Sequence, residues 1–368
     1  MVIIRLILLA LVPVYLADGL SDGSEDGKAK EYYDNPDGKA KEYYDKEYHD
    51  GTVAMVCNSY INRWFKITAP TRRVHKGIYA EPGMFPFMGG LGWRYKDSTK
   101  FGFHCAGTLI SAKFILTAAH CTILPTKTAI KYVSRKPNIV AFDIENIGEV
   151  NTFVHIKNII QHPKYHSPMK YHDIALIESD VNIEFTDFVY PACLWTQGFN
   201  PDFEIKPVVV GWQFEEPSDI PNAKSERLKY GKVNLLENVE CNDIVTSIGG
   251  IRLLRDGIVD SQLCAQGGEE GDTCKGDSGG PLLYYGPIKR YFPTVIAVTS
   301  FGLLHSGPAA CQPTFPGVYT RVSQYIDWIE KVAFSGVGWS WVQAGLVLFT
   351  FHYRRARRAP ARLTGDLP

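Results

Sequence analysis

A glycine-rich stretch around one serine constrains this sequence more than any other feature. Residues 271–281 read Gly-Asp-Thr-Cys-Lys-Gly-Asp-Ser-Gly-Gly-Pro, with the serine at position 278. Glycines allow the backbone to approach a neighbouring group closely, which suits an oxyanion site formed by the N–H groups of Gly276 and Ser278. Ser278 is therefore a candidate nucleophile. The alternative is a Gly/Asp/Ser turn without a chemical role.

Two further motifs supply what a serine nucleophile requires. A serine hydroxyl is weakly nucleophilic until a base takes its proton. Residues 117–121 read Thr-Ala-Ala-His-Cys and offer His120 as the base. Residues 172–176 read His-Asp-Ile-Ala-Leu and offer Asp173 as the group that holds the base in its correct tautomer. The chain order is histidine, aspartate and serine, one of several orders in which this chemistry occurs.

Together these motifs resemble the trypsin-like serine proteases, and the resemblance covers residues 74–334. It implies an all-β fold of two packed antiparallel β-barrels, with the catalytic triad at their junction. Independently of the resemblance, short apolar runs punctuated by glycine and proline continue to Thr320 and suggest all-β structure. Apolar residues at helical spacing over 322–334 predict a closing C-terminal helix. By the same resemblance His172 lies outside the triad, and we interpret it as structural.

The resemblance also implies a specificity pocket. Asp272 would form its floor, and because a desolvated carboxylate needs a cation, the substrate would place Arg or Lys there. Gly302 and Gly317 match the glycines of the pocket wall. Ser300 and Phe301 lie in the segment that resembles the strand pairing with the substrate backbone, with Phe301 where trypsins carry tryptophan.

Eight cysteines, an even number, fit an oxidising compartment. The number alone leaves the pairing open. The resemblance selects four pairs, of which the last would tether a propeptide: Cys105–Cys121, Cys241–Cys264, Cys274–Cys311 and Cys57–Cys193.

The same family is activated by a cut after a basic residue. By resemblance, the cut lies between Arg73 and Val74, and the freed ammonium of Val74 would pair with Asp277 and order the oxyanion loop. His75 and Lys76 replace the valine and glycine usual in this N-terminus. The alternative is that residues 72–73 are a solvated pair of arginines.

The remaining segments are interpreted from composition. Residues 1–17 predict a signal peptide, with an uncleaved anchor as the alternative. Residues 18–73 predict a low-complexity, largely disordered prosegment. Within it a repeat at 26–34 and 37–45 carries tyrosines that are either sulfated, docked to a basic partner or part of a spacer. In the tail, 335–368, an apolar stretch followed by arginines is either a membrane anchor or a poorly ordered extension, and we predict a soluble secreted protein.

Equal numbers of basic and acidic residues, 39 each, argue against a general nucleic-acid binder. No metal site or cofactor is expected, and Asp143, Glu145 and Glu149 are interpreted as a solvated loop rather than a calcium site. Several segments resemble insect cascade proteases of the snake type, although the six-cysteine clip domain common in them is absent. The resemblance implies three partners: a downstream zymogen as substrate, an upstream trypsin-like activator and a serpin inhibitor. A non-catalytic protease homologue and a digestive trypsin are the alternatives.

Overall fold

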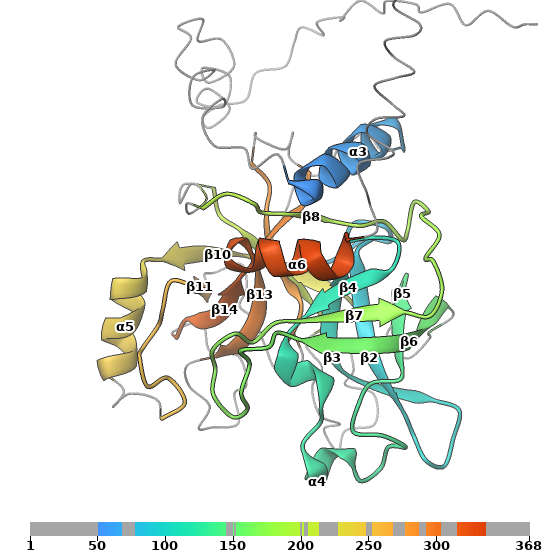
Figure 1. Cartoon of the computed structure of the whole chain (residues 1–368), viewed down its shortest axis with the longest axis horizontal. Coiled ribbons are helices and arrows are strands. Elements are labelled where there is room, and N and C mark those ends of the chain that lie inside the picture. Colours follow the sequence, from blue (N-terminus) through green and yellow to red (C-terminus); the bar gives the residue numbers. More distant parts are fainter. Residues whose placement is uncertain are drawn as a thin grey trace, which may run out of the picture. The chain divides into compact units, whose positions relative to one another are not determined.

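The computed structural model describes eleven stretches of the chain (Figure 1), namely 51–67, 78–144, 150, 152–198, 201, 205–212, 227–247, 252–267, 277–286, 292–302 and 315–335. Within them the chain forms two closed antiparallel β-barrels followed by a C-terminal helix, which confirms the predicted all-β fold.

The first barrel closes in the strand order β2-β3-β4-β7-β6-β5. Its interior holds large apolar side chains that are fully buried, including Leu91, Trp93 and Ile115. Its strands are β2 (Met88–Arg94), β3 (Phe101–Leu109), β4 (Phe114–Thr117), β5 (Ile139–Phe142), β6 (Thr152–Gln161) and β7 (Ala175–Ser179).

The second barrel has the order β9-β10-β11-β14-β13-β12, and β9 closes it by pairing with both β10 and β12. Its strands are β9 (Val208–Gly211), β10 (Lys229–Leu236), β11 (Gln262–Gly267), β12 (Pro281–Tyr284), β13 (Thr294–Gly302) and β14 (Gly317–Arg321). Two short strands extend this sheet. Strand β1 (Ile78–Tyr79) pairs with β10, and β8 (Cys193–Leu194) pairs in parallel with β13.

Within the described stretches, five short helices connect or close the barrels. They are the 3₁₀ helix η1 (Ala119–Thr122), α4 (Thr126–Ala129), α5 (Asn238–Ser247), the 3₁₀ helix η3 (Val322–Tyr325) and α6 (Ile326–Ala333). The predicted closing helix is thus present as η3 followed by α6, with Val322, Tyr325 and Ile329 buried. None of the helices within the described stretches is long and apolar enough to cross a membrane. The tail beyond residue 335, on which the anchor interpretation rests, lies outside them.

Helix α3 (Thr52–Ile67) departs from the disorder expected for residues 18–73. Its buried residues Val53, Cys57 and Ile61 recur every four positions and therefore share one helix face. Cys57 forms a disulfide with Cys193, and the Val53 N–H donates to Glu330 Oε1 at 2.9 Å. Figure 1 shows α3 above β8 and α6, the elements that carry these partners. A docking surface for its apolar face explains why this part of the segment is ordered.

The structure forms three of the four disulfides that the resemblance implied. Besides the bond at Cys57, Cys105 is joined to Cys121 and Cys241 to Cys264. Cys274 and Cys311, the fourth pair, lie outside the described stretches.

Candidate active site

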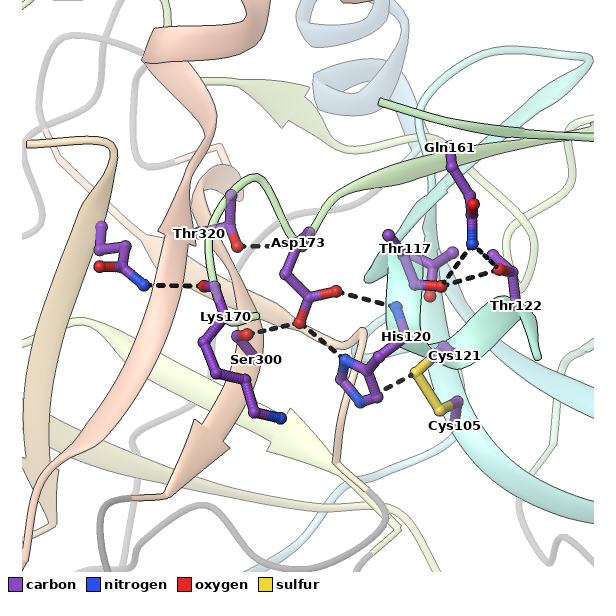
Figure 2. A network of polar contacts seen from close by, with 12 residues as sticks. Cys105, Thr117, His120, Cys121, Thr122, Gln161, Lys170, Asp173, Ser300 and Thr320 are labelled. Carbon is purple, nitrogen blue, oxygen red and sulfur yellow. Dashed lines mark hydrogen bonds and ion pairs between the residues drawn. A yellow bond between two sulfur atoms is a disulfide. The ribbon is translucent and has the colours of Figure 1, made fainter. Parts of the chain in front are cut away.

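Strand register in the first barrel brings His120 and Asp173 together. Thr117 at the end of β4 is paired with Ala175 at the start of β7. Because the strands are antiparallel, the residues after β4 and before β7 leave the barrel at the same end. There the Nδ1 atom of His120 lies 2.7 Å from Asp173 Oδ2, and the His120 backbone N–H donates to Asp173 Oδ1 at 2.8 Å (Figure 2).

Asp173 is surrounded by donors although its side chain is only 1% exposed. The Ser300 hydroxyl donates to Oδ2 at 2.5 Å, and the Thr320 hydroxyl donates to the Asp173 carbonyl oxygen at 2.9 Å. Burial alone would raise the pKa of this carboxyl. The charge of His120 and the hydrogen bonds from His120 and Ser300 outweigh burial and hold the pKa below its ordinary value. Asp173 is therefore a carboxylate and acts as an acceptor.

A bulge in the second barrel directs Ser300 at Asp173. Strand β13 pairs Thr299 with Tyr319 and Phe301 with Val318. Two residues of β13 therefore lie opposite one residue of β14, which is a β-bulge. Ser300 is the extra residue, and a bulge of this kind re-aims a side chain. The second barrel thereby contributes a hydrogen bond to the His–Asp pair of the first.

The turn that carries His120 is held by hydrogen bonds from β6 and by a disulfide to β3. Gln161 of β6 donates from Nε2 to the Ala119 carbonyl at 3.2 Å and to the Thr122 hydroxyl at 2.7 Å. The neighbouring Cys121 is joined to Cys105 of β3. The His120 side chain remains 29% exposed, so a substrate can reach its ring.

Those two cysteines and His120 form the one cluster of possible metal ligands among the described residues. Both sulfur atoms belong to a disulfide, so neither is the thiolate that binds a metal. The cluster does not fit a metal ion.

Main-chain hydrogen bonds attach the Ser278 turn to both barrels. The Ala106 N–H of β3 donates to the Ser278 carbonyl at 2.9 Å, and the Gly279 N–H donates to the Thr299 carbonyl of β13 at 2.8 Å. Ala106 follows Cys105, whose disulfide partner is the residue after His120. Ser278 and His120 are therefore both anchored to the same short stretch of β3.

Glycines allow this turn to pack so closely. Gly279 has φ +80, and a Cβ there would overlap the Thr117 hydroxyl and the Ala106 carbonyl oxygen. Asp277 is 4% exposed and lies against Gly211, where a Cβ would overlap its carboxylate. The turn therefore excludes side chains at two positions around the serine.

The other predicted site residues fall into two groups. Gly302 and Gly317, the expected pocket walls, are paired directly across β13 and β14. Asp272, Gly276, Arg73, Val74 and the calcium candidates Glu145 and Glu149 lie outside the described stretches.

Two supporting residues were missed from the sequence, Gln161 and Thr320. Both lie far from the motifs they support, since Thr320 is 147 residues from Asp173 and Gln161 is 42 residues from Ala119. For Thr320 the available signal was a polar residue within an apolar strand, which indicates a buried polar group in need of a partner. Gln161 ends a strand of mixed polarity and carries no such signal.

Two closed barrels, a histidine paired with a buried aspartate and a glycine-flanked serine anchored to both barrels define a trypsin-like serine protease. The chain belongs to the trypsin family of serine endopeptidases, since the model of that family, described as Trypsin, matches residues 74–329.

Curated relatives agree with this assignment. The chain is 36% identical to serine protease snk of Drosophila melanogaster over 70% of this chain and 56% of that protein, so it spans just over half of this relative. It is 33% identical to CLIP domain-containing serine protease C9 of Anopheles gambiae, over 70% of this chain and 68% of the relative. It is 34% identical to phenoloxidase-activating factor 1 of Holotrichia diomphalia, over 70% and 69% respectively.

Proposed function

We propose that this chain is the zymogen of a secreted trypsin-like endopeptidase that cleaves after Arg or Lys in an extracellular proteolytic cascade. The observation that carries the proposal is the shared anchoring of Ser278 and His120 on β3, with Asp173 at 2.7 Å from His120. This arrangement supplies a nucleophile, a base and an orienting acid within one small region.

The proposed reaction uses these groups in turn. His120 takes the proton of the Ser278 hydroxyl while the Ser278 oxygen attacks the scissile carbonyl. Asp173 stabilises the imidazolium that forms. The N–H groups of Gly276 and Ser278 bind the oxyanion, and His120 then returns the proton to the leaving amine. Water repeats the sequence on the acyl-enzyme and restores Ser278.

Specificity for Arg or Lys rests on Asp272 at the pocket floor. The pairing of Gly302 with Gly317 supports this proposal, because two opposed glycines leave the strand surface clear of side chains. A long basic side chain could lie across these two glycines and pair with the carboxylate.

Activation by cleavage after Arg73 is supported by a distance argument. Tyr79 of β1 is paired with Lys229 of β10, and Lys229 with Gly211 of β9, beside which Asp277 lies. Neighbouring strands are about 4.8 Å apart, so Tyr79 is about 10 Å from Gly211. Five extended residues span about 17 Å. A new N-terminus at Val74 can therefore reach Asp277.

A regulatory role is supported by the retained prosegment and by the relatives. The disulfide between Cys57 and Cys193 and the docking of α3 would keep the prosegment attached after the cut. One relative is named as an activating factor for phenoloxidase, which fits a protease that acts on another protein. The proposed partners are a downstream zymogen, an upstream trypsin-like activator and a serpin. Secretion agrees with the three disulfides and with the expected signal at 1–17.

The second candidate is a non-catalytic homologue that acts as a binding cofactor. The replacement of the usual Val and Gly by His75 and Lys76 favours it, because insertion of this N-terminus is what would order the oxyanion loop. The alternative of a digestive trypsin agrees less well with the disulfide between Cys57 and Cys193, which would keep α3 and the prosegment attached to the protease.

One experiment tests these alternatives. The purified full chain is cut after Arg73, labelled with a serine-directed phosphonate and assayed on matched Arg, Lys, Phe and Leu substrates. We expect labelling and preference for Arg and Lys, with both labelling and turnover lost in Ser278→Ala. The loss of turnover is on the order of a million-fold. Undiminished labelling of Ser278→Ala, or no turnover by the cut wild-type protein, would overturn the proposal.

A further inference from the structure

Asp173 occupies the middle of a tight turn that leads into β7. The Ile174 N–H donates to the His172 carbonyl oxygen at 2.8 Å, which closes a γ-turn around Asp173. The direction of the Asp173 carboxylate therefore depends on the backbone conformation of the residues in this turn. His172 is the residue through which the chain enters the turn.

The backbone of His172 lies in the left-handed region, with φ 53. A residue with a Cβ adopts this conformation rarely, because the Cβ then crowds the following carbonyl oxygen. Such a conformation persists only where the surrounding structure holds it. If His172 relaxed to a negative φ, the chain would leave it in another direction and would carry the Asp173 carboxylate away from His120.

The hydroxyl of Tyr325 holds the His172 side chain in place. It lies 2.9 Å from His172 Nδ1, and Tyr325 itself is buried in η3. The His162 ring encloses His172 from another side. It stacks on the His172 ring with centroids 5.3 Å apart, and it meets the Tyr325 ring edge on at 5.0 Å. Relaxation of the His172 backbone would therefore break these contacts.

Tyr325 acts from the same part of the chain as Thr320. The Thr320 hydroxyl of β14 donates to the Asp173 carbonyl oxygen at 2.9 Å, and η3 follows β14 directly. The contact from Thr320 holds Asp173 itself, and the contact from Tyr325 holds the residue before it. Strand β14 and η3 thus fix the Asp173 turn relative to the rest of the site.

We propose that Tyr325 is a positioning residue for the reaction, because its hydroxyl keeps His172 in the left-handed conformation that directs the Asp173 carboxylate at His120. The inference rests on the proposed endopeptidase function and adds a residue that touches neither the substrate nor His120. His172 transmits this effect through its backbone.

The first test removes only the hydroxyl, in Tyr325→Phe. The full chain is cut after Arg73, and kcat and KM are measured on a peptide with Arg before the scissile bond. We expect kcat to fall about tenfold, as when a strained backbone conformation is no longer held. KM should stay near the wild-type value, because the proposed pocket residues are unchanged. A purely structural role would leave kcat of the folded protein unchanged.

The second test separates the backbone of His172 from its ring. His172→Gly and His172→Val both remove the imidazole, but glycine adopts a positive φ readily, whereas a β-branched side chain resists it. We expect kcat of the valine variant to be about tenfold below that of the glycine variant. Adding Tyr325→Phe to His172→Gly should change kcat by less than about twofold, since the hydroxyl then has no side chain to hold.

Tyr190→Phe is the matched control. Tyr190 is also a buried tyrosine, and its hydroxyl donates to the Tyr60 carbonyl at 3.0 Å. This variant should have a lower melting temperature and wild-type kcat.

Three results would each overturn the positioning role and leave the proposed function standing. They are wild-type kcat in Tyr325→Phe, equal kcat in His172→Gly and His172→Val, and an undiminished loss when Tyr325→Phe is added to His172→Gly. Failure of the cut wild-type protein to cleave the peptide or to accept the phosphonate label overturns both.

Discussion

The half of the site that carries His120 and Asp173 is held mainly by side-chain hydrogen bonds, whereas the half that carries Ser278 is held by main-chain hydrogen bonds. Around Asp173, the donors are the His120 ring and backbone and the hydroxyls of Ser300 and Thr320. Around Ser278, the contacts run from Ala106 and to Thr299 through the backbone.

This difference predicts two kinds of sensitivity. In the first half, a polar substitution changes charge and proton position while the chain can keep its shape. In the second half, an added methyl group collides with packed neighbours, since a Cβ on Gly279 would overlap Thr117 and Ala106 and a Cβ on Gly211 would overlap the Asp277 side chain. Substitutions on the His–Asp side should therefore lower the catalytic rate more than the stability. Substitutions on the serine side should lower the stability of the fold.

Of the effects that test this comparison, the largest is expected on the rate, in Asp173→Asn. The amide keeps the shape of the carboxylate, but its NH₂ group cannot accept the hydrogen bonds that Asp173 accepts from His120 and Ser300. We expect kcat of the activated protein to fall by about 10⁴-fold. Asp180→Asn, at an exposed aspartate just after β7, is the control and should keep wild-type kcat. An Asp173→Asn protein with near-normal kcat would contradict the role of Asp173.

The second prediction concerns stability, in Gly279→Ala. Positive φ and overlap with Ala106 and Thr117 should together destabilise the fold by about 3 kcal/mol. The melting temperature would then fall by about 10 °C. Gly198→Ala is the control, because a Cβ on Gly198 meets nothing within 4 Å. Equal melting temperatures for the two variants would show that the serine turn adapts to a side chain.

The smallest expected effect is a pH dependence confined to the His–Asp side. His172, which precedes Asp173, lies 2.9 Å from the Tyr325 hydroxyl through Nδ1 and stacks on His162 with ring centroids 5.3 Å apart. Burial lowers the pKa of His162, and the positive charges of His172 and Lys164 lower it further. Burial, Lys164 and His166 lower the pKa of His172.

Both rings thus bind protons less readily in the folded chain than in the unfolded chain. As the pH falls through about 6.5, the unfolded chain takes up more protons and stability decreases. The carboxyl of Asp173 has a lowered pKa and titrates at more acidic pH. Between pH 7 and pH 5, His162→Gln should reduce the fall in melting temperature by about 2 °C. His155→Gln, at an exposed position of β6, should not. A steeper fall in His162→Gln than in wild type would contradict this sign.

The motifs around His120, Asp173 and Ser278 are local and chemically specific, so the sequence predicted the residues of the proposed triad and, through the family resemblance, the two-barrel fold. The helical spacing over 322–334 predicted the closing helix. Strand register, which brings His120 to Asp173, follows from pairing between segments far apart in the chain and was supplied by the family resemblance alone. The bulge at Ser300 and the support from Gln161 depend on tertiary contacts that no local pattern encodes.

Helix α3 is the clearest departure from the expected structure. Its apolar residues Val53, Cys57 and Ile61 are spaced by four, which is a helical signal. The low-complexity composition of the preceding residues obscured it. The helix also depends on a partner for its N-terminus, Glu330, which lies 277 residues away from Val53. A short helix with its first donors unsatisfied is marginal by itself.

The docking of α3 determines whether the rest of the prosegment stays attached to the protease after a cut at Arg73. The cut breaks the backbone but leaves the bond between Cys57 and Cys193, so residues before the helix stay in the same molecule as the active site. The repeat at 26–45 ends a few residues before α3. A ligand held by that repeat would encounter the protease at an effective concentration on the order of millimolar, independent of its concentration in the surrounding fluid. The prosegment would then remain on the mature enzyme as a docking segment that localises it to a binding partner.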